Sequence, residues 1–424
     1  MKIFKPFILI IFFSVYSLHA QEVTLTKFFR FFINANYDSS RAFIEKELLK
    51  DPDNPVLHLY LGRVFLVQKK YSSAISCFKK AIQNNKSDAA IYNYIGKAYE
   101  EQGMLSEAAD AYTSSIKLDS SLYAQLKLGS IFFKQNNYNA CSAVLIKLIS
   151  RDSTNLYAFY LLGRAFIRSG KYDSTIIISS KAAHIDSTNY PNLLNLGIAF
   201  FNSRLYKDAV ETLRKAVIIS PESYEARYYL GYSYIKLDQR ADAVTQLEFC
   251  ANSNSRFKQK ALIALIDFYR KIGLNKECIR TAKKFLELDT KNYLTTVYFH
   301  LGCALSDEQN YSEADSAFQK SLKFSTLPLI KGVYFYRGLN SHKQKEYIKA
   351  INYYQKAVAL NPDDPYTYYN LAIVYDEFYK DKMPAIKYYQ KFLDYYKNKD
   401  DNSVLVQAAT NRIKALKQKL YFTK

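Results

Sequence analysis

Tryptophan is absent from this 424-residue sequence, and glycine and proline are scarce, with 12 and 9 residues respectively. An all-β sandwich or barrel needs a turn about every 8–12 residues, which so few turn formers cannot supply. Hydrophobic residues nevertheless make up 49% of the chain and aromatic residues 16%, which excludes a disordered or low-complexity protein. The composition therefore predicts a mostly helical chain that buries a core, with Tyr and Phe as its only aromatic residues.

Cysteine is also scarce, and its five residues are odd in number, widely spaced and never arranged as CxxC. A disulfide framework or a zinc site would need closer or even-numbered ligands. We therefore predict that the cysteines are small core residues and that the chain has no metal site. They are Cys77, Cys141, Cys250, Cys278 and Cys303.

The familiar catalytic and nucleotide-binding motifs are missing. The sequence contains no GxGxxG, GxxxxGK[ST], GxSxG or HExxH. Its five histidines are scattered, without Cys or Asp partners at ligand spacing. Because a nucleophile, a base and oxyanion donors cannot be assembled, the sequence predicts a protein that is not an enzyme and uses no cofactor.

Long apolar runs are absent after the first twenty residues, which form a different kind of segment. Lys2 and Lys5 give a positive start, residues 7–15 are almost wholly apolar, and the segment ends on the small residue Ala20. This layout predicts a signal peptide over residues 1–20, cleaved to leave Gln21 first. An uncleaved anchor is the alternative, but the run falls short of the roughly 20 residues that span a bilayer. We expect an exported protein, periplasmic or envelope-associated, with no transmembrane segment in the mature chain.

Basic residues outnumber acidic ones by 59 to 39, and the formal net charge is +20. Such a surplus favours acidic partners: nucleic acid, anionic lipid or polysaccharide, or an acidic protein surface. The basic residues are spread along the whole chain, so a generally basic, soluble surface explains them equally well. Export disfavours nucleic acid as the partner.

A regular series of glycines divides most of the chain into equal units. Twelve residues after each of these glycines stands a small residue, and four further on a large apolar one in most units. Spacings of three and four place residues on one face of a helix. Glycine inside a helix costs about 0.5–1 kcal/mol relative to alanine, so the series indicates close approach of neighbouring helices. Its members are Gly62, Gly96, Gly129, Gly163, Gly197, Gly231, Gly302 and Gly338.

Gly103, Gly170 and Gly273 stand seven residues after the position that the glycine series occupies in each unit, where a first helix must turn into a second. The whole pattern resembles the tetratricopeptide repeat family, whose 34-residue helix-turn-helix unit carries Leu-Gly, an aromatic, Ala, Phe, Ala and a closing Pro. The resemblance implies an all-α fold, a right-handed superhelical solenoid of such repeats. The clearest unit holds Gly338, Tyr347, Ala350, Tyr354, Ala357 and Pro362.

The sequence departs from the family pattern in places. The early Trp is missing throughout, Ile266 and Ala372 replace the glycine, and Thr175 and Ser179 weaken one unit. We count about eleven units: residues 21–54 as a degenerate first repeat, then the solenoid over residues 55–398. A C-terminal capping helix and tail follow at 399–424. Asn54 and Asp364, each before a Pro, are candidate helix N-caps.

The resemblance also implies where a partner binds. In the family the concave groove is lined by first helices, at positions three before and one, four and five after the glycine. Tyr123 and Tyr157, six before their glycines, are expected to line the same face. Further along, the same positions hold Asp267, Asp307 and Asp376, so the sign of the groove is expected to change. Some of the aromatic residues in the groove could simply pack between adjacent first helices. The candidate groove residues are Arg63, Lys97, Tyr123, Phe133, Tyr157, Tyr160, Arg164, Arg168, Tyr228, Tyr232 and Lys236.

These observations predict a non-enzymatic protein–protein interaction scaffold exported to the cell envelope. An aromatic groove with Arg and Lys suits extended or acidic segments of other proteins, here expected to belong to an envelope or secretion assembly. The alternative is a binding protein for an anionic envelope polymer, a glycan or lipopolysaccharide. A steep loss of affinity with added salt would favour the polymer.

Overall fold

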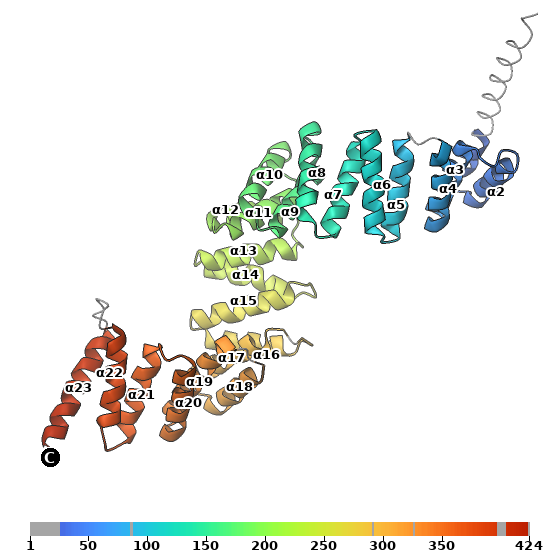
Figure 1. Cartoon of the computed structure of the whole chain (residues 1–424). Coiled ribbons are helices and arrows are strands. Elements are labelled where there is room, and N and C mark those ends of the chain that lie inside the picture. The colour runs from blue at the N-terminus through green and yellow to red at the C-terminus, as the bar shows by residue number, and fades with distance from the viewer. Residues whose placement is uncertain (1–25, 85–87, 291, 325–326, 397–403, 423–424) are drawn as a thin grey trace, which may run out of the picture. The chain divides into compact units, whose positions relative to one another are not determined.

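The protein is described from a computed structural model over residues 26–84, 88–290, 292–324, 327–396 and 404–422 (Figure 1). The predicted signal peptide, residues 1–20, lies outside these ranges. The described residues contain helices and turns and no β-strand, so the all-α prediction is confirmed.

The chain divides after Pro221 into two compact units, each a row of helices packed in chain order (Figure 1). Unit 1 begins with a helical segment at residues 26–33. Its further helices are α2 (Tyr37–Leu48), α3 (Pro55–Val67), α4 (Tyr71–Asn84), α5 (Ala89–Glu101), α6 (Leu105–Leu118), α7 (Leu122–Lys134), α8 (Tyr138–Arg151), α9 (Leu156–Arg168), α10 (Tyr172–Ile185), α11 (Tyr190–Asn202) and α12 (Tyr206–Ile219).

Unit 2 continues the same alternation of first and second helices. Together the two units hold eleven helix pairs in the described residues, followed by a single last helix. The helices of unit 2 are α13 (Tyr224–Lys236), α14 (Arg240–Ala251), α15 (Lys258–Lys271), α16 (Asn275–Leu286), α17 (Leu294–Asp307), α18 (Tyr311–Phe324), α19 (Leu327–Lys343), α20 (Tyr347–Leu360), α21 (Pro365–Phe378), α22 (Met383–Tyr396) and α23 (Val404–Phe422).

The glycine series marks the closest contact between the two helices of a pair. A Cβ added at Gly62 would lie 2.6 Å from the ring of Phe78, and one at Gly197 would lie 2.5 Å from Leu213. Both partners stand sixteen residues after their glycine and are fully buried. The glycines are therefore retained for close packing, as the sequence predicted.

One pair packs differently. Gly163 faces Ser179 where most other pairs have a large apolar side chain, and Asn195 from the next pair fills the space, 2.9 Å from the added Cβ. The Asn195 amide donates to the carbonyl of Tyr160 at 2.9 Å. This unit thus has a buried polar contact between repeats in the place of the missing apolar side chain.

The ends of the first helices follow sequence rules. Asn54 and Asp364 cap α3 and α21 as predicted, each accepting from backbone N–H groups of the first turn. In the turn between the two helices of a pair, seven residues after the position of the glycine series, the backbone adopts a positive φ. It does so at Gly103 and Gly170 but also at non-glycine residues such as Lys69 and Arg204. The turn geometry is therefore set by the repeat and holds where no glycine favours it.

The C-terminal helix closes unit 2. Ala409, Ile413 and Leu416 of α23 are buried against α22, and the residues between them are exposed. All five cysteines are buried with free thiols, as expected of core residues. None of the described helices combines the length and the apolar character needed to cross a bilayer.

Candidate partner-binding face

The candidate groove residues lie on first helices, which contact one another along each unit. In unit 1, α9 packs against both α7 and α11, and α3 against α5. We call the solvent side of α3, α5, α7, α9 and α11 the first-helix face of unit 1. In unit 2, α13 contacts α15, and the series continues through α17 and α19 to α21.

Four predicted residues stand out from the first-helix face of unit 1. Lys97 on α5 and Arg168 at the end of α9 are exposed. Tyr123 and Tyr157 are 46% and 53% exposed, so each presents much of its ring to solvent. Tyr157 lies beside Tyr160, with ring centroids 5.9 Å apart. These residues supply the cations and aromatic surface that the sequence placed in the groove.

Other predicted groove residues are packed against side chains of the protein itself. The Arg63 guanidinium lies over the rings of Phe32, Tyr60 and Tyr94, at 5.4–5.6 Å from each centroid. It thereby links α3 to the neighbouring helices on both sides. Phe133 is half-buried and packs edge-on against Tyr138 of its own pair, 5.6 Å between centroids. Arg164 is half-buried as well.

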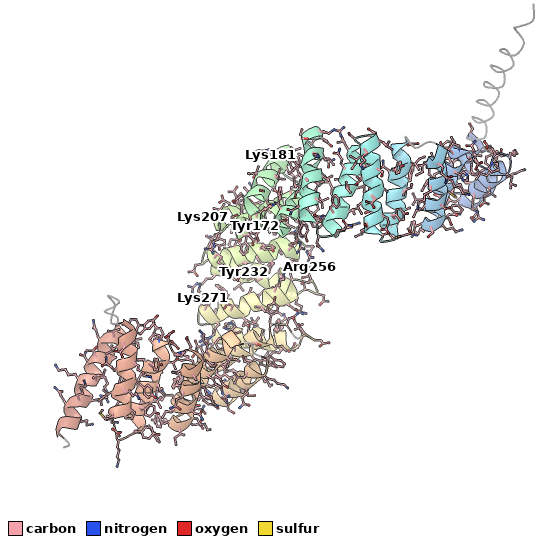
Figure 2. The ribbon with its side chains drawn as sticks, in the orientation of Figure 1. Tyr172, Lys181, Lys207, Tyr232, Arg256 and Lys271 are labelled. Carbon is pink, nitrogen blue, oxygen red and sulfur yellow. The ribbon has the colours of Figure 1, made fainter. Side chains whose placement is uncertain are left out.

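The remaining three candidates lie on α13 of unit 2. Tyr228 is half-buried, with Phe257 at 5.6 Å and Tyr232 at 6.0 Å between ring centroids, and burial raises the pKa of its hydroxyl above the usual range. The Lys236 ammonium lies over the ring of Tyr232, 5.4 Å from the centroid; Tyr232 is labelled in Figure 2. Tyr228 is thus packed between helices, whereas Lys236 is exposed.

Ion pairs between successive first helices were missed at the sequence level. Glu100 of α5 accepts from Lys134 and Lys127 of α7 at 2.8 and 3.3 Å. Burial favours the protonated carboxyl, but these two lysines outweigh it and lower the pKa of Glu100. Glu100 and Lys134 occupy the positions four and five after their glycines, so the groove phases already contained the signal.

Unit 2 repeats this arrangement through most of its first helices. Asp307 of α17 pairs with Arg270 of α15 at 3.0 Å and with Lys343 of α19 at 3.6 Å. Asp376, which is 6% exposed, pairs with Arg412 of α23 at 2.6 Å.

Two of the three aspartates expected to change the sign of the groove, Asp307 and Asp376, are therefore matched by cations on neighbouring helices. Within the described residues Asp267 has only the His300 ring, at 3.8 Å, and burial lowers the pKa of that histidine.

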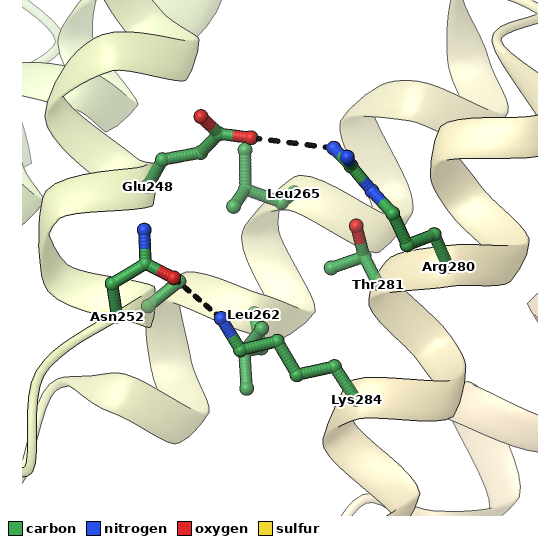
Figure 3. A pocket seen from close by; sticks show the side chains of 8 residues that line it. Glu248, Asn252, Leu262, Leu265, Arg280, Thr281 and Lys284 are labelled. Carbon is green, nitrogen blue, oxygen red and sulfur yellow. Dashed lines mark hydrogen bonds and ion pairs between the residues drawn. The ribbon is translucent and has the colours of Figure 1, made fainter.

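A cavity of about 320 Å³ lies between α14, α15 and α16 (Figure 3). Two polar contacts cross it, Glu248 to Arg280 at 3.7 Å and Asn252 to Lys284 at 2.5 Å. Arg280 pairs with Glu248 and Lys284 donates to the amide of Asn252, so both cations of this cavity already have a partner within the fold.

A second cavity, of about 360 Å³, lies between α19, α20 and α21, and we call it the α19–α21 pocket. Phe335 and Tyr366 supply aromatic walls, and Gly332 also lies in the lining. Phe335 stands three residues before its glycine, a groove phase, so the pocket belongs to the first-helix side of unit 2. It is lined by Lys331, Gly332, Phe335, Ala357, Asn361, Asp364 and Tyr366.

Family models agree with this architecture. A model described as TPR repeat matches residues 62–103 and 338–377, and two models described as tetratricopeptide repeat match residues 194–248 and 295–325. These matches fall on helix pairs in both units, within an uninterrupted series of the same pairs. The chain belongs to the tetratricopeptide repeat family. No curated protein sequence matches it.

Several solved structures are similar at low identity, and two of those named here are described as TPR proteins. YrrB, described as a TPR protein with an unusual peptide-binding site, is 17% identical over 43% of this chain and 95% of its own, with a TM-score of 0.40. The C-terminal part of a TPR repeat-containing protein from Cytophaga hutchinsonii is 20% identical over 57% and 98%, with a TM-score of 0.49. A chain of the APC/C hetero-tetramer Cut9–Hcn1 is 14% identical over 91% of this chain and 95% of its own, with a TM-score of 0.44.

Tetratricopeptide repeats bind other proteins, and this repeat protein is a protein–protein interaction scaffold. Stacked helix pairs leave an extended row of first helices on which a partner chain can lie. The fold is typical of scaffolds that perform no catalysis.

Proposed function

We propose that this repeat protein is exported to the cell envelope, where it holds an extended, acidic segment of a partner protein on the first-helix face of unit 1. The observation that carries the proposal is the charge of that face. Four of its five helices, α3, α7, α9 and α11, contain no Asp or Glu at all.

The acidic residues on the fifth helix, α5, do not neutralise the face. They are Glu100, which is engaged by two lysines of α7, and Glu101 at the end of the helix. Lys97 on α5 and Arg168 on α9 are exposed, and so are Tyr123 on α7 and Tyr157 on α9. Exposed Arg and Tyr side chains are the residue types that contribute most to binding at protein interfaces. Unit 2 differs, because its first helices carry acidic residues, and three of these, Glu225, Asp307 and Asp376, are paired with arginines.

Export is supported by the residue order at the N-terminus. A basic start, an apolar run over residues 7–15 and Ala20 follow the layout of a cleaved leader. N-terminal sequencing of the protein purified from its own cells tests this part. A mature chain beginning at Gln21 is expected, and an intact Met1 in the cytoplasmic fraction would contradict export.

A matched pair of charge reversals tests the binding face. Lys97→Glu combined with Arg168→Glu changes the first-helix face, and Lys181→Glu combined with Lys207→Glu makes the same charge change on the second helices α10 and α12 (Figure 2). Each variant captures proteins from an envelope extract, and the eluates are compared by mass spectrometry. Proteins with acidic segments should be lost only from the first variant.

Other outcomes decide against parts of the proposal. Proteins retained equally by both variants would place the binding site outside this face. Recovery of carbohydrate or lipid with no protein, with capture that falls steeply as salt is added, would replace the protein partner by an anionic polymer.

A further inference from the structure

The polar and apolar sides of helix α10 are in part the reverse of those of its neighbours. On its buried side Ser179 stands where α8 and α12 have Leu145 and Leu213, and all three side chains are fully buried. Within the described residues the Ser179 hydroxyl has no hydrogen-bond partner, which makes its burial unfavourable. On the opposite side of α10, Ile177 is 58% exposed. The helix thus turns a hydroxyl to the core and a large apolar side chain to solvent.

The exposed isoleucine is specific to α10. It stands fourteen residues after Gly163, and in the other units of the glycine series this position is exposed and holds a small or polar residue. These residues are Ser76, Asp110, Ala143, Glu211, Thr245, Ser316 and Asn352. A single exposed apolar residue is common on protein surfaces, so its neighbours on the helix decide whether it marks a contact.

Opposite charges flank Ile177 on the same face of α10. Asp173 comes four residues before it and Lys181 four residues after it, and residues four apart line one face of a helix. Both charged side chains are exposed, and within the described residues neither forms an ion pair. They lie about 12 Å apart along the helix, at about 1.5 Å per residue, which is too far for them to pair with each other. Ile146 and Ile218, also exposed on second helices, lack such a pair of charges within their helices.

This face of α10 is complementary to itself. A two-fold axis through the position of Ile177, perpendicular to the helix, exchanges the positions four residues before and four residues after it. Two α10 helices packed antiparallel about such an axis bring their isoleucines together at the centre. Asp173 of each copy then lies opposite Lys181 of the other, so that the contact contains two ion pairs. We propose that two copies of the chain associate in this way through α10.

The contact is confined to one helix of each copy. In the described residues α10 packs against α9 and α11, and the second helices do not pack closely on one another. On either side, α8 and α12 carry the exposed cations Lys147 and Lys207, which disfavour a wider contact between two copies. Interfaces below about 1,200 Å² in total belong to weak, transient complexes. The dimer should therefore form as the protein concentration rises and dissociate on dilution.

A cysteine on a two-fold axis meets the same cysteine of the other copy, which provides a direct test. In Ile177→Cys the two thiols face each other across the contact, and oxidised glutathione should join them in a disulfide with release of two reduced glutathiones. The five cysteines of the chain itself are buried and do not compete. The matched control is Glu211→Cys, at the same exposed position of α12. On a non-reducing gel the linked dimer should form at least tenfold faster from the first variant.

Exchange of charges tests the antiparallel arrangement by sedimentation equilibrium of the purified protein. Asp173→Lys alone and Lys181→Asp alone each place like charges opposite one another, so each should raise the dissociation constant of the dimer at least fivefold. The double variant restores opposite charges across the contact and should return to within twofold of the wild type. Ile177→Ser, which introduces the residue that α4 and α18 carry at this position, should raise the dissociation constant at least tenfold. Circular dichroism melts confirm that all variants remain folded.

Three results would overturn the proposal. The first is a monomer at every concentration with no preferential cross-linking at position 177. The second is a dimer that Ile177→Ser and the single charge changes leave intact, which places self-association elsewhere. The third is a double variant that stays as weak as the single ones. The proposal is independent of the function proposed above, because Asp173→Lys leaves the first-helix face of unit 1 unchanged and should capture the same proteins as the wild type.

Discussion

Two glycines on the same helix should respond to alanine in opposite ways. Gly338 and Gly332 both lie within α19, so replacing either by Ala gains the same helix propensity, about 0.8–1.0 kcal/mol. Their surroundings differ. A Cβ on Gly338 would lie 2.7 Å from two ring carbons of Tyr354, whereas the nearest atoms to a Cβ on Gly332 are 3.7 Å away.

The size of the effect follows from the packing of Tyr354. Carbon atoms prefer a separation of about 3.5–4.0 Å, so the ring would have to retreat by about 1 Å. The Tyr354 side chain is completely buried in the core of unit 2 and has no space for this movement. Overpacking of this kind costs about 1–3 kcal/mol. Because the propensity gain is common to both variants, Gly338→Ala should be about 1–3 kcal/mol less stable than Gly332→Ala.

Hydrogen exchange read by mass spectrometry suits this measurement, because a repeat array opens locally and need not unfold as a single unit. Amides of α19 and α20 should exchange faster in Gly338→Ala than in wild type by up to a few tens of fold, since 1.4 kcal/mol corresponds to tenfold. They should exchange more slowly in Gly332→Ala. Equal protection in the two variants would refute the claim that Gly338 is retained for close helix packing.

Three smaller predictions concern the turns, the thiols and one ion pair. Arg204 has a φ of 63°, so Arg204→Gly should raise the free energy of unfolding by about 1 kcal/mol and with it the melting temperature. Gly170 has a φ of 71°, so Gly170→Ala should lower both by a similar amount. Burial raises the pKa of four of the five thiols to about 12 and that of Cys77 to about 11, so Ellman's reagent at pH 8 should react with none until guanidinium is added. The Glu100 carboxylate has a lowered pKa in the folded chain, so its stabilisation is present at neutral pH and lost as pH falls through that lowered value. Glu100→Gln should therefore destabilise the chain at pH 7, and the difference should vanish in acid.

The sequence predicts the parts of this fold that each repeat sets by itself. The contact of a glycine with the residue sixteen positions later, and the caps at Asn54 and Asp364, depend on short spacings within one helix pair. The positive φ at Arg204 is less evident, because the residue has no glycine-like preference and the repeat imposes the turn.

Features that depend on neighbouring repeats were not predictable in the same way. The contact of Asn195 with Gly163 joins side chains from adjacent pairs, and no spacing within one repeat specifies it. The groove phases place Glu100 and Lys134 on the same side of the unit, but only the packing of adjacent pairs shows that they form an ion pair. The sequence selects the candidate groove residues only by their position relative to the glycine of each repeat. The packing is needed to show that Arg63 lies among three rings while Lys97 faces solvent. That these residues bind a partner remains a prediction.

Site-specific photocrosslinking in living cells tests most directly whether partners lie on the first-helix face of unit 1. A photoreactive phenylalanine analogue replaces Tyr157 on α9 or, as the matched position on a second helix, Tyr172 on α10 (Figure 2). We expect a discrete protein adduct from position 157, containing an acidic segment at the linked peptide, and none from position 172. Adducts of the same protein from position 172 alone, or no protein adduct from position 157, would contradict the account.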